Sequence, residues 1–417
     1  MKRSLVYFCR TVVFLGATGL LTFSGSHRTA LAGGQGKAYF TEAQANTVGV
    51  LDSRSNKVLK RISVPKGAHG VAITPDGSRA FVSSDESNII SVIDTKSDEI
   101  VGTIPTGKQP HGLLTGRDGR HIFAAIFGDD QVLEIDARSL KVVKTFDAPS
   151  PHNLAQSPDG NVMYFAAQKK GATGIGRIDL QSGTVKELVK TETVPRALGI
   201  SPDGATLCAT LFDKNEVEFY STSPLKQIAS VGVGGSPHHV LFTTDGKHVL
   251  VVNQLSNDLF IIDPETHSVA GKVAVGRKPH WIALTADSKY AYVTDEASNE
   301  ISLVDLIDKD VEQTITVGAA PRKIALQTNS SERVTISLQG PPPRFVPETV
   351  RIAPGTTVEW VNNGRSIHTV TDDGGQWDSG SMGPGEKYTR TFSRKGTFPY
   401  HCTPHAEMGM VGTIVVE

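Results

Sequence analysis

Short runs of alternating apolar and polar residues recur along residues 38–327. In one copy the runs cover residues 281–284, 290–294, 300–305 and 311–317, and turns rich in Asp, Ser, Asn and Gly separate them. Alternation with a period of two predicts β-strands that bury one face. Clusters of Gly, Asn, Asp and Ser between such runs predict tight turns. Each copy therefore predicts four consecutive strands, and the region is expected to be all-β.

A short anchor opens every copy of this pattern. It consists of a proline (alanine in the first copy), a basic residue and an apolar run, and successive anchors lie 41 to 44 residues apart. That period is typical of four-stranded propeller blades. Seven anchors predict seven blades. Only one strand follows the last anchor, so we expect residues 38–41, 48–52 and 58–64 to complete the seventh blade, a closure that leaves no free sheet edge.

The repeat resembles a known family. The segment Tyr292-Val293-Thr294-Asp295 and the pattern at residues 92–107 are similar to the Tyr-Val-Thr-Asn type of propeller repeat. The resemblance implies a seven-bladed β-propeller over residues 33–327, with the strand after each anchor innermost and lining a central channel. Such a resemblance specifies a fold and says little about function.

A cluster of possible metal-ligating residues lies near the C-terminus. Cys402, His405 and two methionines, Met408 and Met410, fall within nine residues, and His368 lies upstream. One thiolate, two imidazoles and a thioether form the ligand set of a blue-copper electron-transfer site. A two-copper site would need a second thiolate in the loop, so the sequence predicts a mononuclear centre.

Residues 334–417 resemble a plastocyanin-type cupredoxin, close to pseudoazurin and amicyanin. The resemblance is carried by Phe345-x-Pro347, Thr357-Val358-x-Trp360-x-Asn362, His368 and the loop Cys402-Thr403-Pro404-His405. It implies a Greek-key β-sandwich that holds a type 1 copper through His368, Cys402, His405 and Met410. Met410 is favoured over Met408 because the family's axial methionine also stands directly before the closing strand. The family likeness further implies that electrons pass through a partly exposed His405.

The basic residues of the anchors form a ring if the anchor strands line a channel. These ring residues are His69, His111, His152, Arg196, His238, His280 and Arg322. Three interpretations compete. The ring is structural, with imidazoles bonded to neighbouring blades; or it is a second metal site, for copper, with His69, His111 and His152 as ligands; or it is an anion site.

The overall plan resembles nitrous-oxide reductase, which joins a seven-bladed propeller to a cupredoxin domain and carries a histidine-bound copper cluster at the hub. This chain has fewer ring histidines and a loop with one thiolate. We therefore do not assign nitrous-oxide reduction to it.

Two segments outside the predicted domains, at the N-terminus and between the domains, have recognisable sequence patterns. Residues 1–32 combine a basic start, a short apolar stretch and Ala30-Leu31-Ala32, which predicts a cleaved secretory signal. The apolar stretch is short for a membrane span, so we expect a periplasmic or extracellular protein with no membrane span after signal cleavage. Residues 328–333 are polar and predict a short linker.

Composition and motifs narrow the function. The 42 basic and 43 acidic residues nearly balance, so nothing suggests nucleic-acid binding. No nucleophilic triad, phosphate loop, haem motif or zinc motif is present, and no catalytic residue is assigned.

The sequence predicts an exported copper protein that exchanges electrons with a redox partner protein, its propeller serving as a docking or binding platform. The alternative is a copper oxidoreductase with a second, histidine-bound metal at the hub and a small anionic ligand or substrate. Whether the protein is an enzyme stays open.

Overall fold

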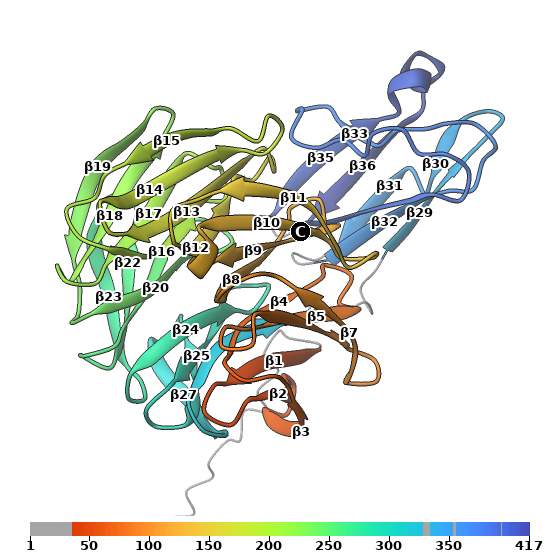
Figure 1. The fold of residues 1–417 in the computed structure, drawn as a ribbon. Helices are drawn as coiled ribbons and strands as arrows, with labels where there is room; N and C mark the ends of the chain where they lie inside the picture. Colours follow the sequence, from red (N-terminus) through yellow and green to blue (C-terminus); the bar gives the residue numbers. More distant parts are fainter. Residues whose placement is uncertain (1–35, 328–333, 353–355, 393) are drawn as a thin grey trace, which may run out of the picture. The chain divides into compact units, whose positions relative to one another are not determined.

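The computed structural model describes residues 36–327, 334–352, 356–392 and 394–417. The predicted signal, residues 1–32, and the predicted linker, residues 328–333, lie outside the described residues. Almost every regular element is a β-strand (Figure 1). In the described part of the chain, no helix has the length and apolar character needed to cross a membrane.

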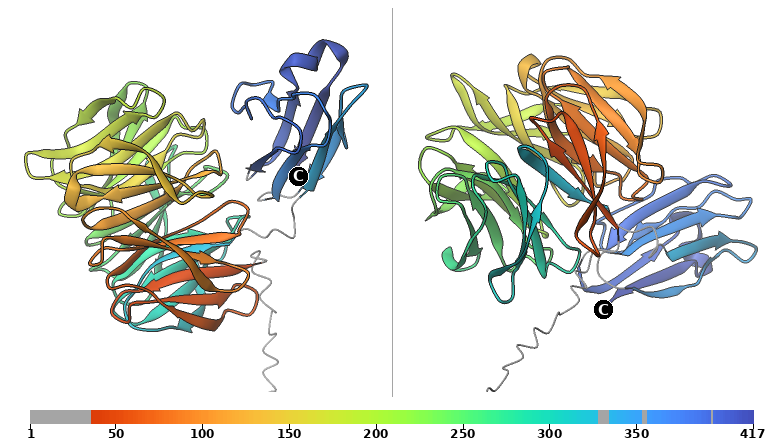
Figure 2. Two further views of the ribbon diagram at one scale, coloured as in Figure 1. Left: turned by 45° about the vertical axis from the view of Figure 1, so that its right-hand side comes forward. Right: turned by 90° about the horizontal axis from the view of Figure 1, so that it is seen from below.

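Seven four-stranded antiparallel sheets make up the first part of the chain, arranged around a centre like blades (Figure 2). In blade order, their strands are β4 (Ala68–Ile73), β5 (Arg79–Ser84), β6 (Ile89–Asp94) and β7 (Glu99–Pro105); β8 (Pro110–Thr115), β9 (His121–Ile126), β10 (Gln131–Asp136) and β11 (Lys141–Asp147); β12 (Pro151–Gln156), β13 (Val162–Lys169), β14 (Ala172–Asp179) and β15 (Val185–Val189); β16 (Pro195–Ile200), β17 (Thr206–Leu211), β18 (Glu216–Thr222) and β19 (Leu225–Gly232); β20 (Pro237–Phe242), β21 (Val249–Asn253), β22 (Asp258–Asp263) and β23 (Ser268–Ala274); β24 (Pro279–Leu284), β25 (Tyr290–Asp295), β26 (Glu300–Asp305) and β27 (Asp310–Thr316); and β28 (Pro321–Leu326) with β1 (Lys37–Glu42), β2 (Thr47–Asp52) and β3 (Lys57–Ser63). A 3-10 turn, η1 (Phe127–Asp129), follows β9.

The seventh blade joins the two ends of the propeller. Strand β28 pairs antiparallel with β1, with Tyr39 opposite Ala325. The first strand of each blade contacts the first strand of the next, and β28 in turn contacts β4. The seven anchor strands therefore form a closed inner ring, which confirms the predicted seven blades and the predicted closure.

Burial along each blade explains why these residues form strands. The second strand, such as β5 or β25, is buried at almost every position because sheets cover both of its faces. The fourth strand, such as β7, is largely exposed. Turns at equivalent places put Asn46, Asn88 and Asn299 at positive φ, a conformation that asparagine tolerates better than most residues.

The second part of the chain is a β-sandwich of two four-stranded sheets, ordered β30-β29-β32-β34 and β31-β36-β35-β33. Its strands are β29 (Val334–Gln339), β30 (Arg344–Val346), β31 (Thr349–Ile352), β32 (Thr356–Asn362), β33 (Thr371–Asp372), β34 (Lys387–Phe392), β35 (Gly396–His401) and β36 (Val411–Val416), with a 3-10 segment η3 (Thr403–Met408). The pairs β29/β32 and β31/β36 are parallel, and the other pairs are antiparallel. The cupredoxin-like sandwich predicted from the sequence is confirmed.

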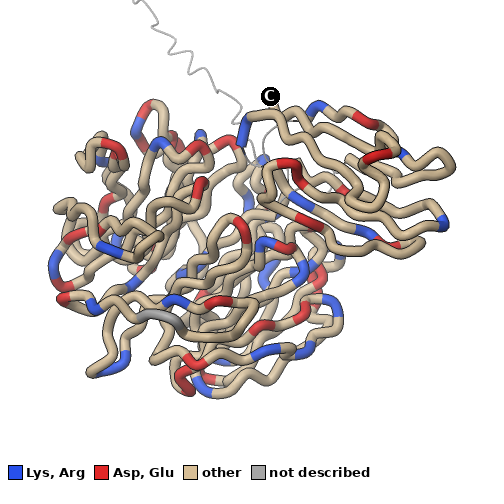
Figure 3. Tube along the Cα trace, turned by 90° about the horizontal axis from the view of Figure 1, so that it is seen from above, with Lys and Arg blue, Asp and Glu red and all other residues tan. Residues whose placement is uncertain are grey.

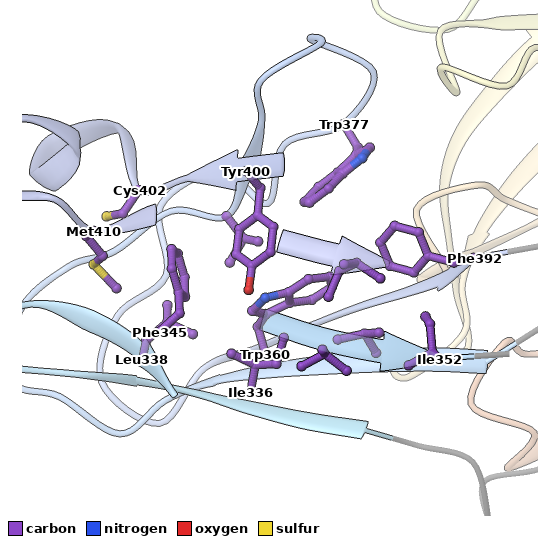
Figure 4. Close-up of a cluster of buried hydrophobic side chains, with 14 of the residues drawn as sticks. Ile336, Leu338, Phe345, Ile352, Trp360, Trp377, Phe392, Tyr400, Cys402 and Met410 are labelled. Atoms are coloured by element: carbon purple, nitrogen blue, oxygen red, sulfur yellow. The ribbon is translucent and has the colours of Figure 1, made fainter. Parts of the chain in front are cut away.

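The sandwich has a core of its own, in which Trp360 is fully buried (Figure 4). Tyr400, Trp377 and Phe392 surround it, with ring centroids 5.4, 5.6 and 6.2 Å away. Cys402 and Met410 lie at one end of the same cluster. The core therefore holds the base of the loop that carries the candidate ligands.

Charged residues of both signs are interspersed over each part of the chain (Figure 3). The near balance of basic and acidic residues in the whole chain therefore also holds within each part of it.

Candidate metal centre and the propeller hub

Three predicted ligands meet at one end of the sandwich. The Cys402 Sγ atom lies 3.6 Å from Nδ1 of His368 and 3.3 Å from Nδ1 of His405. Among the described residues, these three form the only group of three or more His, Cys, Asp or Glu side chains whose ligand atoms all lie within 4.8 Å of one another. The site joins the loop after β32, the end of β35 and η3.

The donor set fits a copper ion. First-row metals such as zinc bind sulfur at about 2.3 Å and nitrogen at about 2.0 Å, which places the two donor atoms roughly 3.5 Å apart in a tetrahedral arrangement. The sulfur–nitrogen distances lie on either side of this separation. Both imidazoles present Nδ1 to the sulfur, so one ion between the three atoms would meet all of them.

Hydrogen bonds hold the cysteine loop to the segment that carries His368. The Thr369 backbone N–H donates to Cys402 Sγ at 3.3 Å, and the Thr403 backbone N–H donates to Thr369 Oγ1 at 2.8 Å. Burial raises the pKa of the Cys402 thiol, and the N–H of Thr369 opposes that rise by stabilising the thiolate. Thr369 was not singled out from the sequence, because its role depends on a contact between distant segments.

The position of His368 is fixed by Asn362 at the end of β32. The Asn362 Nδ2 group donates to the carbonyls of Ser366 and Met382, each at 2.8 Å. His368 and Met382 also exchange backbone hydrogen bonds of 3.1 and 2.8 Å. His368 is 1% exposed, and burial lowers the pKa of its imidazole, which favours the neutral form that binds metals.

The two candidate axial methionines differ sharply in burial. Met410 is fully buried in the sandwich core, whereas Met408 is 70% exposed. The Cys402 backbone N–H donates to the Met410 carbonyl at 3.0 Å, which closes the loop between them. Met410 therefore lies in the core that also contains Cys402, and its assignment as the axial ligand stays a prediction.

The ring residues lie at the start of the inner strands, and their five imidazoles form a nearly continuous circuit. Ring centroids are 3.8 Å apart for His69 and His111, 4.0 Å for His111 and His152, and 4.1 Å for His238 and His280. Where an arginine intervenes, the separations are 6.2 Å (His152 to His238) and 5.8 Å (His280 to His69). Burial is the main cause that lowers the pKa of each imidazole below its ordinary value.

Every ring residue's backbone carbonyl accepts a side-chain hydrogen bond from the preceding blade. Four carbonyls accept a hydroxyl from the second strand: Thr41 donates to His69, Ser83 to His111, Thr210 to His238 and Thr294 to Arg322. The other three accept an imidazole Nδ1: His111 donates to His152, His152 to Arg196 and His238 to His280. In the three blades that carry these donor histidines, the second strand has no hydroxyl at the equivalent position. The residue there is Ala125, Ala166 or Val252.

This division explains which histidines have a structural role. A carbonyl can only accept, so His111, His152 and His238 must carry a proton on Nδ1. His69 and His280 stand in blades that already have a hydroxyl donor, and their buried Nδ1 atoms have no hydrogen-bond partner. The structural interpretation of the ring therefore applies to three of the five histidines.

The two groups of histidine should differ in their effect on stability. Replacing His152 by alanine removes the donor to a buried carbonyl, whereas replacing His280 removes no such bond. We expect the His152 variant to lose about 1–3 kcal/mol more unfolding free energy than the His280 variant. Urea unfolding of both variants measures this difference, and equal losses would contradict the assigned roles.

Comparison with known proteins agrees with the geometry of the C-terminal domain. Residues 334–417 match a family described as copper binding proteins, plastocyanin/azurin family. Plastocyanin from Scenedesmus fuscus is 38% identical over 84 residues, an alignment that covers 18% of this chain and 86% of that protein. Chloroplastic plastocyanin from Silene latifolia subsp. alba is 36% identical over 86 residues, and the chain spans about half (52%) of its length.

The propeller is similar to known propellers in fold. Residues 223–339 match a family described as YNCE-like beta-propeller. A chain of hydrazine synthase from Kuenenia stuttgartiensis aligns with a TM-score of 0.60 and 20% identity, over 68% of this chain and 98% of that one. A functionally unknown protein from Desulfotomaculum acetoxidans aligns with a TM-score of 0.60 and 15% identity, over 70% and 98%. Identities this low establish the fold alone.

The ligand-like cluster, the sandwich and the sequence matches converge on one assignment. A plastocyanin-family domain implies a type 1 copper, and the cluster of two imidazoles and a thiolate lies within the matched residues. The chain thus combines a YNCE-like β-propeller with a C-terminal domain that belongs to the plastocyanin/azurin family of copper-binding proteins.

Proposed function

We propose that this protein is an exported electron-transfer protein with one type 1 copper, held by His368, Cys402, His405 and Met410. The observation that carries the proposal is the approach of Cys402 Sγ to the Nδ1 atoms of His368 and His405, at 3.6 and 3.3 Å. The propeller is a docking or binding platform. Export is supported by the signal pattern of residues 1–32.

The residues around the site favour rapid one-electron exchange. Bound copper would supply a couple between its two oxidation states. Backbone hydrogen bonds from Cys402 to Met410 and from His405 to Cys402 fix the loop, so the donor atoms are held in place whichever oxidation state is bound. Cys402 is fully buried, which keeps water away from the thiolate.

His405 is the candidate route for electrons. It is half-buried, whereas His368 and Cys402 are buried. Exposed apolar side chains stand beside the candidate ligands in sequence: Ile367, Met408 and Val411. An apolar surface of this kind suits a partner protein that must approach closely and leave quickly.

Metal content tests the proposed site. Full-length mature protein would be loaded with copper, desalted and measured as wild type, as Cys402→Ala and as Cys208→Ala. Cys208 is the matched control because it is also buried, but in β17 of the propeller. We expect one copper and a strong visible band in wild type and in the Cys208 variant, and neither in the Cys402 variant.

The same measurement tests the alternative function. Copper that remains in Cys402→Ala would favour an oxidoreductase with a second metal at the hub, which stays a prediction. Absence of copper from all three proteins would refute the proposed function.

The axial position is tested by paired methionine variants. Met410→Leu removes the thioether but keeps the volume of a buried side chain, and we expect it to retain copper and raise the reduction potential. Met408→Leu changes an exposed side chain and should leave the potential unchanged. Voltammetry of both variants checks this, and a shift confined to Met408→Leu would reverse the assignment.

A further inference from the structure

A buried lysine lies at the centre of the propeller, next to the ring. Lys323 follows Arg322 on β28 and is 2% exposed. Its ammonium group lies 4.1 Å from the centroid of the Trp281 ring, which stacks on His239 at 3.4 Å. Its positive charge contributes to lowering the pKa of His69, His111, His152, His238, His239 and His280. The strand that carries it, β28, lies between β24 and β4 in the inner ring.

No described carboxylate balances this charge. Among the described residues, no salt bridge or hydrogen bond of Lys323 Nζ is seen, and burial lowers its pKa to about 7. The ring arginines have other contacts: Arg322 lies 3.6 Å from Glu296, and Arg196 lies over the Phe212 ring. An unpaired buried ammonium is unfavourable unless an anion or deprotonation relieves it.

Two buried acidic residues at the ends of second strands, Glu42 and Asp295, are already engaged. Glu42 pairs with Arg61 and accepts from Thr47 and the Gly318 backbone N–H. Asp295 accepts from Ser302 at 2.7 Å, and burial raises its pKa to about 7. Neither side chain makes a hydrogen bond to a ring imidazole among the described contacts. Both carboxylates are therefore engaged away from the ring histidines.

Two unused donors lie on the strands next to the one that carries the lysine. The inner strands β24, β28 and β4 are neighbours in the ring, and they carry His280, Lys323 and His69 in that order. The Nδ1 atoms of His69 and His280 are buried without a partner. A neutral imidazole can carry its proton on either nitrogen, so both groups can donate.

The same features disfavour a cation. Lys323, Arg322 and Arg196 raise the local positive potential, and no three hub histidines bring their ring nitrogens within 4.8 Å of one another among the described residues. We propose that the centre of the propeller binds a small oxyanion, either a carboxylate or an inorganic anion, through Lys323 Nζ and the Nδ1–H groups of His69 and His280. This site is independent of the copper site.

Anion titration of the copper-loaded full-length protein tests the proposal. The probes are sodium acetate and sodium phosphate at constant ionic strength, with calorimetry and Trp281 fluorescence as readouts. We expect saturable binding of at least one of them to wild type. Acetate binding alone would identify a carboxylate site, and phosphate binding alone an inorganic oxyanion site.

The decisive variant is Lys323→Met, which keeps the length of the side chain and removes the charge. We expect it to lose binding at least tenfold. Lys144→Met is the matched control, because Lys144 also lies over an aromatic ring, Phe146 at 5.1 Å, on an outer strand. If Lys323→Met does not fold, the His69→Asn and His280→Asn variants supply the same test.

The pH dependence gives a second readout. Binding needs protonated Lys323, so the affinity for acetate, which stays ionised in this range, should be constant just below about pH 7 and fall about tenfold per pH unit above it. In Lys323→Arg the affinity should stay flat to higher pH, because a guanidinium does not lose its proton. Undiminished binding in Lys323→Met, no binding of either anion to wild type, or copper bound at the hub in Cys402→Ala would each overturn the proposal.

Discussion

Replacing Ile324 by aspartate is expected to open the propeller. Ile324 is 2% exposed on β28 and belongs to the same apolar cluster as Phe40 and Tyr292, so it ties the closing strand to β1 and to the neighbouring blade. An unpaired charge at this position should cost about 3–5 kcal/mol or more, a large share of the stability of a folded domain. Urea unfolding followed by far-ultraviolet circular dichroism measures the loss.

The matched control is Ile307→Asp. Ile307 is 68% exposed, so the same change should alter stability by no more than about 0.5 kcal/mol. The apolar cluster of the copper domain contains only residues from its own strands and loops, so the visible copper band should persist in both variants. Equal stability of the two variants would show that the closing strand does not hold the ring together.

Replacing Trp360 by alanine is expected to have the largest effect on the copper domain. Its fully buried ring contacts Tyr400, Trp377 and Phe392, and truncation of a buried tryptophan costs about 3–5 kcal/mol. Tyr400 lies two residues before Cys402, so the cavity would also loosen the base of the ligand loop. The copper band should disappear at a lower temperature during thermal unfolding.

Trp360→Phe serves as the control for this prediction. Phenylalanine keeps most of the ring contacts and should lose less stability than alanine, because a smaller cavity is left. A copper domain that unfolds at the wild-type temperature in Trp360→Ala would contradict the central role assigned to this side chain.

The blades were predictable because the same sequence pattern recurs seven times. Seven anchors at one period predicted seven sheets and the shared seventh blade, and both predictions are confirmed. The strand ends were less accurate: the strand predicted at residues 281–284 begins two residues earlier, at Pro279. A proline is tolerated there because the inner strand is an edge of its sheet and needs no donor at that position, a fact that local alternation does not reveal.

The candidate site was predictable where its residues are close in sequence. Spacing alone suggested Cys402, His405 and a methionine, whereas Thr369 acts through a contact that only folding creates. The hub shows the same limit. Whether a ring histidine bonds to the next blade depends on whether a hydroxyl or an apolar side chain stands across the bulge. The burial of Lys323 likewise depends on the closing of β28 into the inner ring.

The shared seventh blade has a consequence for the order in which the protein assembles. Strands β1 to β3 leave the ribosome first, but their partner β28 follows only after six other blades. Until then β1 presents an unpaired edge, which is the kind of surface that other chains can join. The free-energy cost of closing a loop grows slowly with its length. The pairing of β1 with β28 is therefore delayed by the time needed to synthesise the blades between them, and not by an unfavourable closing equilibrium. Chaperone demand should therefore peak just before residue 326 emerges, and fall once the two ends have met.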